Sequence, residues 1–120
     1  MSLSGRFFKS AAKGFHSLIT RAVNFASSRG VLVLSAAGNQ GLDLGQLWDY
    51  VVMPAQAGTG WAVSATGPVD FAYGATNFRR FASYSNYGED LVNVAAPGGD
   101  FVSPNSLWFY DMVLSTCKGT

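Results

Sequence analysis

One segment of the chain carries an uncharged amide in a setting suited to binding a developing negative charge. The sequence Ser35-Ala36-Ala37-Gly38-Asn39-Gln40-Gly41 follows a short apolar run and places Asn39 between two glycines. An amide offers two N–H donors without carrying a charge, which suits the stabilisation of an oxyanion. A plain turn, in which Asn tolerates unusual backbone angles, explains the same residues. Taken alone, the segment leaves both interpretations open.

The elements that must position this segment are a helix and a strand. Apolar residues recur at helical spacing from about Ser10 to Arg29, with Ser10 as the expected N-cap and Gly30 as the residue that ends the helix. The apolar stripe consists of Phe15, Leu18, Ile19, Ala22, Val23 and Ala26. The run 31–35 then predicts a strand buried on both faces. Ligands bind beyond the carboxyl ends of parallel strands, so Asn39 follows at a suitable place.

Further strands are predicted at residues 61–65 and 91–96, and a weaker one at 112–115. The connections 38–45 and 71–88 are long and rich in Gly, Asn, Ser and aromatic residues, as binding or active-site loops often are. The pattern predicts an α/β fold with a mainly parallel sheet.

Composition limits the size and the class of the protein. The chain has 120 residues, which allows one core, and 48% of them are hydrophobic. Charged residues make up 12%, about half of the usual share of roughly 25%. A weakly charged secreted protein and a piece from the interior of a larger domain both fit, and we favour the piece. Residues 1–120 are thus expected to form a single partial domain.

The same figures exclude several partners. The net charge is +1 and the basic residues are scattered, so no nucleic acid is expected. The longest apolar run, 31–34 continuing into 36–37, is too short to cross a bilayer, and no membrane contact is expected.

No cofactor or metal is expected either. The glycines at 38, 41 and 45 do not fit a dinucleotide-binding pattern, and the acidic residues are too dispersed for a calcium loop. Cys117 is interpreted as a buried or incidental thiol. His16 is interpreted as a solvated or half-buried helix residue.

Several blocks occur together in an order that is typical of one family. They are Ser2-Leu3-Ser4-Gly5, the helix with Gly30, Ala36-Ala37-Gly38-Asn39, Met53-Pro54-Ala55, the strand 61–65, Phe81-Ala82-Ser83-Tyr84-Ser85-Asn86-Tyr87-Gly88 and Val94-Ala95-Ala96-Pro97-Gly98. In this order the chain resembles the subtilisin-like serine proteases, or subtilases. The resemblance covers essentially the whole chain and is weakest in the loops 42–51 and 100–111.

The resemblance implies a three-layer α/β/α fold and a role for each matching residue. It implies that Asn39 is the side-chain donor to the oxyanion. Ser2, Leu3, Ser4 and Gly5 would pair with an extended substrate backbone, although Gly is usual where Ser4 stands. Ala36, Ala37 and Gly38 would form a wall of the pocket for the residue before the scissile bond. The peptide bond before Pro54 is often cis in this family.

The resemblance also implies a reaction and its missing parts. Subtilases hydrolyse peptide bonds by acyl transfer through a serine ester, using Asp, His and Ser in that chain order. The Asp and His blocks are expected before residue 1 and the Ser block after residue 120. The chain alone is therefore expected to be inactive, and its parent to be secreted or extracytoplasmic with a peptide or protein substrate.

The sequence leads to two further expectations, one about an alternative function and one about self-association. A non-catalytic α/β module that binds peptides or serves in assembly is the alternative function. Only one helix is available to cover the predicted strands, so the segment is expected to associate with itself through a bare sheet face or edge.

Overall fold

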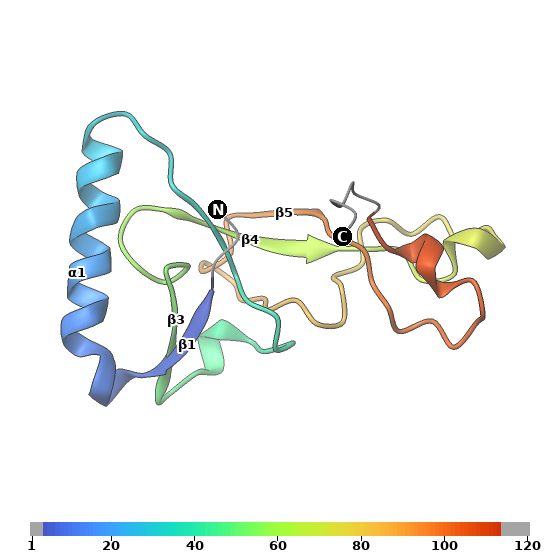
Figure 1. Ribbon diagram of the computed structural model, residues 1–120, viewed down its shortest axis with the longest axis horizontal. Coiled ribbons are helices and arrows are strands. Elements are labelled where there is room, and N and C mark those ends of the chain that lie inside the picture. Colours follow the sequence, from blue (N-terminus) through green and yellow to red (C-terminus); the bar gives the residue numbers. More distant parts are fainter. Residues whose placement is uncertain (1–3, 114–120) are drawn as a thin grey trace, which may run out of the picture.

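The computed structural model describes residues 4–113, which form one long helix, five strands and short 3-10 turns. In chain order the main elements are β1 (Gly5–Phe8), α1 (Lys9–Ser28), β2 (Leu34–Ala36), β3 (Tyr50–Met53), β4 (Trp61–Thr66) and β5 (Val94–Pro97). Figure 1 shows α1 along one flank, with β1 and β3 beside it and β4 running away from them. None of the described helices is long and apolar enough to span a bilayer.

The sheet that bears the Asn39 turn is parallel and has the order β2-β4-β5. Leu34 pairs with Trp61 in its first ladder, and Val63 pairs with Val94 in its second. All three strands run in one direction, so their carboxyl ends meet at one edge. The predicted α/β class with a parallel sheet is confirmed.

The strand boundaries differ from the predicted ones in an informative way. β2 and β5 begin three residues later than expected, whereas β4 begins at Trp61 as expected and extends to Thr66. In the runs 31–35 and 91–96 only the last part joins the ladder, and the residues before it connect the strand to the preceding segment. In the weak run 112–115, Met112 forms a single bridge with Gly99, and residues 114 and 115 lie outside the described part of the chain.

A second, antiparallel pair of strands carries the helix. β1 pairs with β3 so that Gly5 lies opposite Met53, and α1 contacts both of these strands. Ala12, Val51 and Met53 form a buried cluster between them. No strand is predicted at 50–53 from the sequence, because this run has only four residues before a proline and becomes a strand by pairing with the distant β1.

The helix ends are close to prediction, but the expected N-cap is wrong. α1 begins at Lys9 with Phe8 as N-cap, and that cap makes no side-chain hydrogen bond. β1 leads directly into the helix, and the Lys9 N–H donates to Asp49 O at 2.8 Å, so Ser10 already lies within the first turn. At the other end Gly30 has a φ of 77°, as predicted for the residue that ends the helix.

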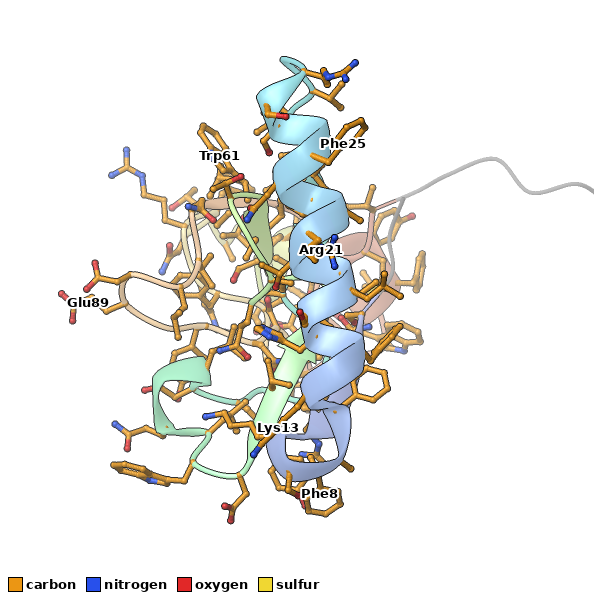
Figure 2. All side chains as sticks on the ribbon, turned by 90° about the vertical axis from the view of Figure 1, so that its left-hand side faces the viewer. Phe8, Lys13, Arg21, Phe25, Trp61 and Glu89 are labelled. Carbon is orange, nitrogen blue, oxygen red and sulfur yellow. The ribbon has the colours of Figure 1, made fainter. Side chains whose placement is uncertain are left out.

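Much apolar surface stays exposed. Figure 2, viewed from the flank, shows α1 across the front of the molecule with Lys13, Arg21 and Phe25 along it. Within the apolar stripe Val23 is buried, but Leu18 is 62% exposed. The run 31–35 is predicted to be a strand buried on both faces, but Leu34 is 50% exposed; β5 is exposed along its length too, in line with the expected bare sheet face. The helix packs on β1 and β3 and leaves this sheet largely uncovered.

Candidate functional site

The turn that follows β2 has a defined and unusual backbone. The Ala37 N–H donates to Val63 O at 2.9 Å, which extends the β2–β4 pairing by one residue. Gly38 and Gly41 then adopt φ angles of 106° and 63°, in the region that favours glycine. Between them Asn39 lies exposed in a bend. The sequence prediction that this turn follows a parallel strand is therefore confirmed.

A cavity of about 390 Å³ opens at this turn. It lies over the sheet, and its walls are made largely of small residues. The cavity is lined by Leu34, Ser35, Ala36, Ala37, Gly38, Asn39, Val63, Ser64, Ala65, Tyr84, Ser85, Ala96, Pro97 and Gly98. Four of the predicted site residues, 36 to 39, are thus brought together on one cavity.

One buried side chain holds the turn. Asn86 is 0% exposed, and its Nδ2 donates to Ala37 O at 2.9 Å. Its Oδ1 accepts from the backbone N–H of Gln40 and from that of Leu42, both at 3.0 Å. These bonds attach to the backbone on both sides of Asn39. Asn86 belongs to the family-like block 81–88, but the sequence alone indicates no role for it.

Asn86 is held in turn by its neighbours. Its backbone N–H donates to Gly38 O at 3.0 Å. The hydroxyl of Ser64, on β4, donates to Asn86 O at 2.6 Å, and the Ala65 N–H donates to the hydroxyl of Ser85 at 2.8 Å. The segment 85–86 is therefore attached both to the sheet and to the turn.

Gly38 is required for this packing. A Cβ at Gly38 would lie 2.5 Å from Asn86 Nδ2 and 2.9 Å from the side-chain oxygen of Gln40. Both distances are shorter than real Cβ contacts, and the positive φ disfavours any side chain. Glycine at this position permits the close approach of Asn86 to the turn.

The other predicted substrate-binding residues lie elsewhere or outside the description. Ser4 and Gly5 line a separate apolar hollow of about 530 Å³, together with Val33, Met53 and Pro54. The Met53–Pro54 peptide bond is cis, which confirms the expectation for Pro54. Ser2 and Leu3 lie outside the described residues. The structure thus does not place Ser4 or Gly5 on the Asn39 cavity.

The remaining candidate groups do not line the Asn39 cavity. His16 is half-buried, with Nε2 3.0 Å from Gln56 O, and it lines a different hollow with Asp90 and Asn93. In residues 4–113 no group of three or more His, Cys, Asp or Glu side chains is placed to hold a metal ion. Cys117 lies outside that range.

Charged groups hold a different part of the chain, the loops within 70–111. Asp100 is fully buried and accepts from the Arg80 guanidinium, from the N–H and hydroxyl of Ser83, and from the Phe101 N–H. Burial by itself raises the pKa of Asp100, but these hydrogen bonds outweigh burial and hold the pKa below its ordinary value.

Two more carboxylates act in the same loops. Asp111 accepts from the N–H groups of Asp70 and Phe71 at 2.9 and 2.7 Å. Asp70 accepts in turn from the Ser103 hydroxyl and the Asn105 amide, and these bonds lower its pKa. The acidic residues that look dispersed in the sequence therefore bind backbone and side-chain donors.

Comparison with known proteins identifies the family. The profile described as "Subtilase family" matches residues 1–120. No curated protein sequence matches the chain.

Solved structures agree with that match. A lanthipeptide protease shares 25% identity with the chain at a TM-score of 0.65, over 82% of this chain and 28% of that one. The psychrophilic subtilisin-like protease Apa1 from Pseudoalteromonas sp. AS-11 shares 28% identity at 0.53, over 82% and 17%. The epidermin leader peptide processing protease EpiP from Staphylococcus aureus, at 24% identity and 0.57 over 68% and 20%, supports the fold. The chain thus spans less than a third of each, and it belongs to the subtilase family.

Proposed function

We propose that residues 1–120 form the central segment of the catalytic domain of a subtilisin-like serine endopeptidase, with Asn39 as its side-chain oxyanion donor. The observation that carries this proposal is the exposed amide of Asn39 at the carboxyl edge of a parallel sheet, on a cavity with small walls. Family membership supplies the reaction class, and the resemblance implies a secreted or extracytoplasmic enzyme.

In this proposal Asn39 acts only as charge develops. Attack of a serine hydroxyl on the peptide carbonyl places a negative charge on the carbonyl oxygen. The Asn39 amide donates an N–H to that oxygen and stabilises it without a proton transfer. The serine, its histidine base and the aspartate that orients the base come from segments of the parent outside residues 1–120.

The substrate contacts are proposed partly from the cavity beside Asn39 and partly from the family resemblance. Ala36, Ala37 and Gly38 have small or absent side chains, so a substrate side chain can approach the end of β2 closely. We assign these residues to the wall of the pocket for the residue before the scissile bond. Ser2, Leu3, Ser4 and Gly5 are assigned to an edge that pairs with an extended substrate backbone. The substrate is a peptide or a protein.

The test of this function is Asn39→Ala in the full-length protease that contains the segment. A donor that engages only the transition state affects kcat and leaves KM nearly unchanged. The expected loss of kcat is about 10²- to 10³-fold, a size taken from subtilisin, the standard measured case for such a donor. The matched control is Asn24→Ala, which removes an amide on α1 that accepts from Thr59.

A loss confined to KM contradicts the donor role. A full-length wild-type protein that binds peptides but does not cleave them supports the alternative function, a non-catalytic peptide-binding or assembly module. Steady-state kinetics and a binding titration with the same peptide separate these outcomes.

The proposal also describes residues 1–120 in isolation. Without a nucleophile the donor has no tetrahedral intermediate to stabilise, so the segment takes no label from a fluorophosphonate probe. The exposed apolar side chains of β2 and β5 make it associate with itself, as sedimentation equilibrium would detect. Labelling of one serine, or a monodisperse and cooperatively unfolding monomer, contradicts these two statements respectively.

A further inference from the structure

We propose that Asn86 is a positioning residue for catalysis, because its buried amide sets the backbone that presents Asn39. This inference rests on the proposed role of Asn39 and assigns a second residue to the same site. Asn86 makes no hydrogen bond to the Asn39 side chain, so its action passes through the turn.

The side-chain hydrogen bonds of Asn86 attach to the backbone both before and after Asn39. Nδ2 donates to the carbonyl of Ala37, two residues before Asn39, and Oδ1 accepts from Gln40 N–H, one residue after it. The second bond to Oδ1 comes from Leu42 N–H. With the backbone attached on both sides, the peptide groups flanking Asn39 have little freedom to rotate.

Asn39 depends on this attachment because its side chain has no hydrogen-bond partner among residues 4–113. Within residues 4–113 the Asn39 amide makes no hydrogen bond, and the residue is exposed. A donor must lie within hydrogen-bond distance of the oxyanion when charge develops, and an error of about 1 Å in placement can cost on the order of 10²-fold in rate. The point and direction from which the Asn39 side chain projects are therefore set by its backbone, which Asn86 holds.

The amide is the side chain whose shape and charge fit this task. Its oxygen accepts from two N–H groups while its nitrogen donates to the Ala37 carbonyl and, at 3.0 Å, to the Gln40 side-chain oxygen. An ionised Asp offers no donor for either oxygen and adds a negative charge near the proposed oxyanion. Replacement by Ala leaves the two N–H groups and the Ala37 carbonyl without this partner.

The backbone contacts of Asn86 do not depend on its side chain. Its N–H to Gly38 O bond and the Ser64 hydroxyl bond to its carbonyl remain possible in Asn86→Ala. The variant thus removes the side-chain hydrogen bonds to the Asn39 turn and keeps the attachment of segment 85–86 to the sheet.

The experiment is a double-mutant cycle in the full-length protease. The variants are Asn39→Ala, Asn86→Ala, the double variant and the control Asn24→Ala. Asn86→Ala is expected to lower kcat by about 10- to 100-fold with KM nearly unchanged. In the double variant kcat should equal that of Asn39→Ala alone, because positioning has no effect once the donor is gone.

The outcomes separate the two proposals. If Asn39→Ala leaves kcat unchanged, the donor role fails, and the inference fails with it. If Asn39→Ala lowers kcat but Asn86→Ala behaves like Asn24→Ala, only the inference is overturned. Additive losses in the double variant overturn it as well, since they indicate an effect independent of Asn39.

A second variant covers the case in which Asn86→Ala does not fold, as judged by circular dichroism. Asn86→Ser is uncharged and keeps one hydroxyl, but this shorter side chain cannot replace both the donor to Ala37 and the acceptor for Gln40 and Leu42. The same criteria apply: a kcat loss that disappears in the Asn39→Ala background supports the inference, and wild-type kcat overturns it.

Discussion

Two regions of this chain are held by polar side chains that are buried or partly buried, and they use different chemistry. The turn around Asn39 is held by the neutral amide of Asn86. The loops within 70–111 are held by three carboxylates, Asp70, Asp100 and Asp111, each of which accepts at least two hydrogen bonds. Charged hydrogen bonds are roughly twice as strong as neutral ones, so the turn does not use the stronger type.

We attribute the difference to the proposed role of the Asn39 turn. Near a developing oxyanion a fixed negative charge opposes the charge that forms, and the opposition is large where water is excluded. An amide binds both N–H and C=O groups without adding such a charge. In the loops within 70–111 no charge is proposed to develop during the reaction, so carboxylates can serve there as hydrogen-bond acceptors. We therefore expect Asn86 to act mainly on turnover and Asp100 mainly on stability.

The largest expected effect comes from Asp100→Ala. It leaves the Ser83 and Phe101 N–H groups and the Arg80 guanidinium without their acceptor. The expected loss is about 2–4 kcal/mol of the free energy of unfolding, reduced from the range for fully buried pairs because the Arg80 side chain is 37% exposed. Urea denaturation of the full-length protease measures it, and kcat at a temperature where the variant is folded should change little.

The control for this variant is Asp43→Ala. The Asp43 carboxylate accepts one bond, from Gly45 N–H at 2.9 Å, at the start of a 3-10 turn. Its removal should cost about 1 kcal/mol or less. Equal losses in the two variants, or a kcat loss in Asp100→Ala as large as in Asn86→Ala, would remove the distinction between the two regions.

A smaller effect is expected from Gly38→Ala, which disturbs the neutral region alone. The added methyl would meet Asn86 Nδ2 at 2.5 Å, and the positive φ adds strain. We expect a loss of roughly 1–3 kcal/mol in stability together with a fall in kcat. The control Gly14→Ala adds a methyl on α1 with nothing within 4 Å, and should stabilise by about 0.5–1 kcal/mol. A Gly38→Ala enzyme with wild-type kcat would show that the turn tolerates displacement of Asn86.

The smallest effect concerns pH. Because the folded-state pKa of Asp100 lies below its unfolded value of about 3.9, its contribution to stability is present above that value and is lost as pH falls through the folded pKa. In thermal unfolding from about pH 7 to about pH 2.5, the melting temperature should fall more steeply with decreasing pH in wild type than in Asp100→Asn. If the melting temperatures of the two proteins fall in parallel, protonation of Asp100 does not contribute to the loss of stability at low pH. The Asn86 amide does not titrate in this range.

The sequence predicts the local elements well and the long-range contacts poorly. The helix is predicted to within one residue at its end, and the parallel strands appear in the predicted order, because periodicity is a property of neighbouring residues. β3 is missed because its four residues become a strand only by pairing with β1. Ser10 is wrong as an N-cap because β1 runs without a break into α1.

The site divides in the same way. Asn39 and the small residues before it stand out because they follow an apolar run directly. Asn86 does not, since its side-chain bonds join residues 44 to 49 positions apart and no local pattern shows which distant amide meets a turn. Gly38 is predicted as a pocket wall, and the structure adds its closer function, the space it leaves for Asn86.

The separation of 44 to 49 residues between Asn86 and its partners in the turn also bears on how the site forms during folding. A contact between residues far apart in the chain requires a loop to close, and this entropic cost comes before the contact can stabilise the fold. Until the segment around Asn86 packs against the turn, the side-chain hydrogen bonds of Asn86 are absent and the proposed donor Asn39 is not held in place. If Asn39 is the oxyanion donor, we expect a full-length chain in which this contact has not yet formed to cleave peptides poorly, because its donor is not yet held in place.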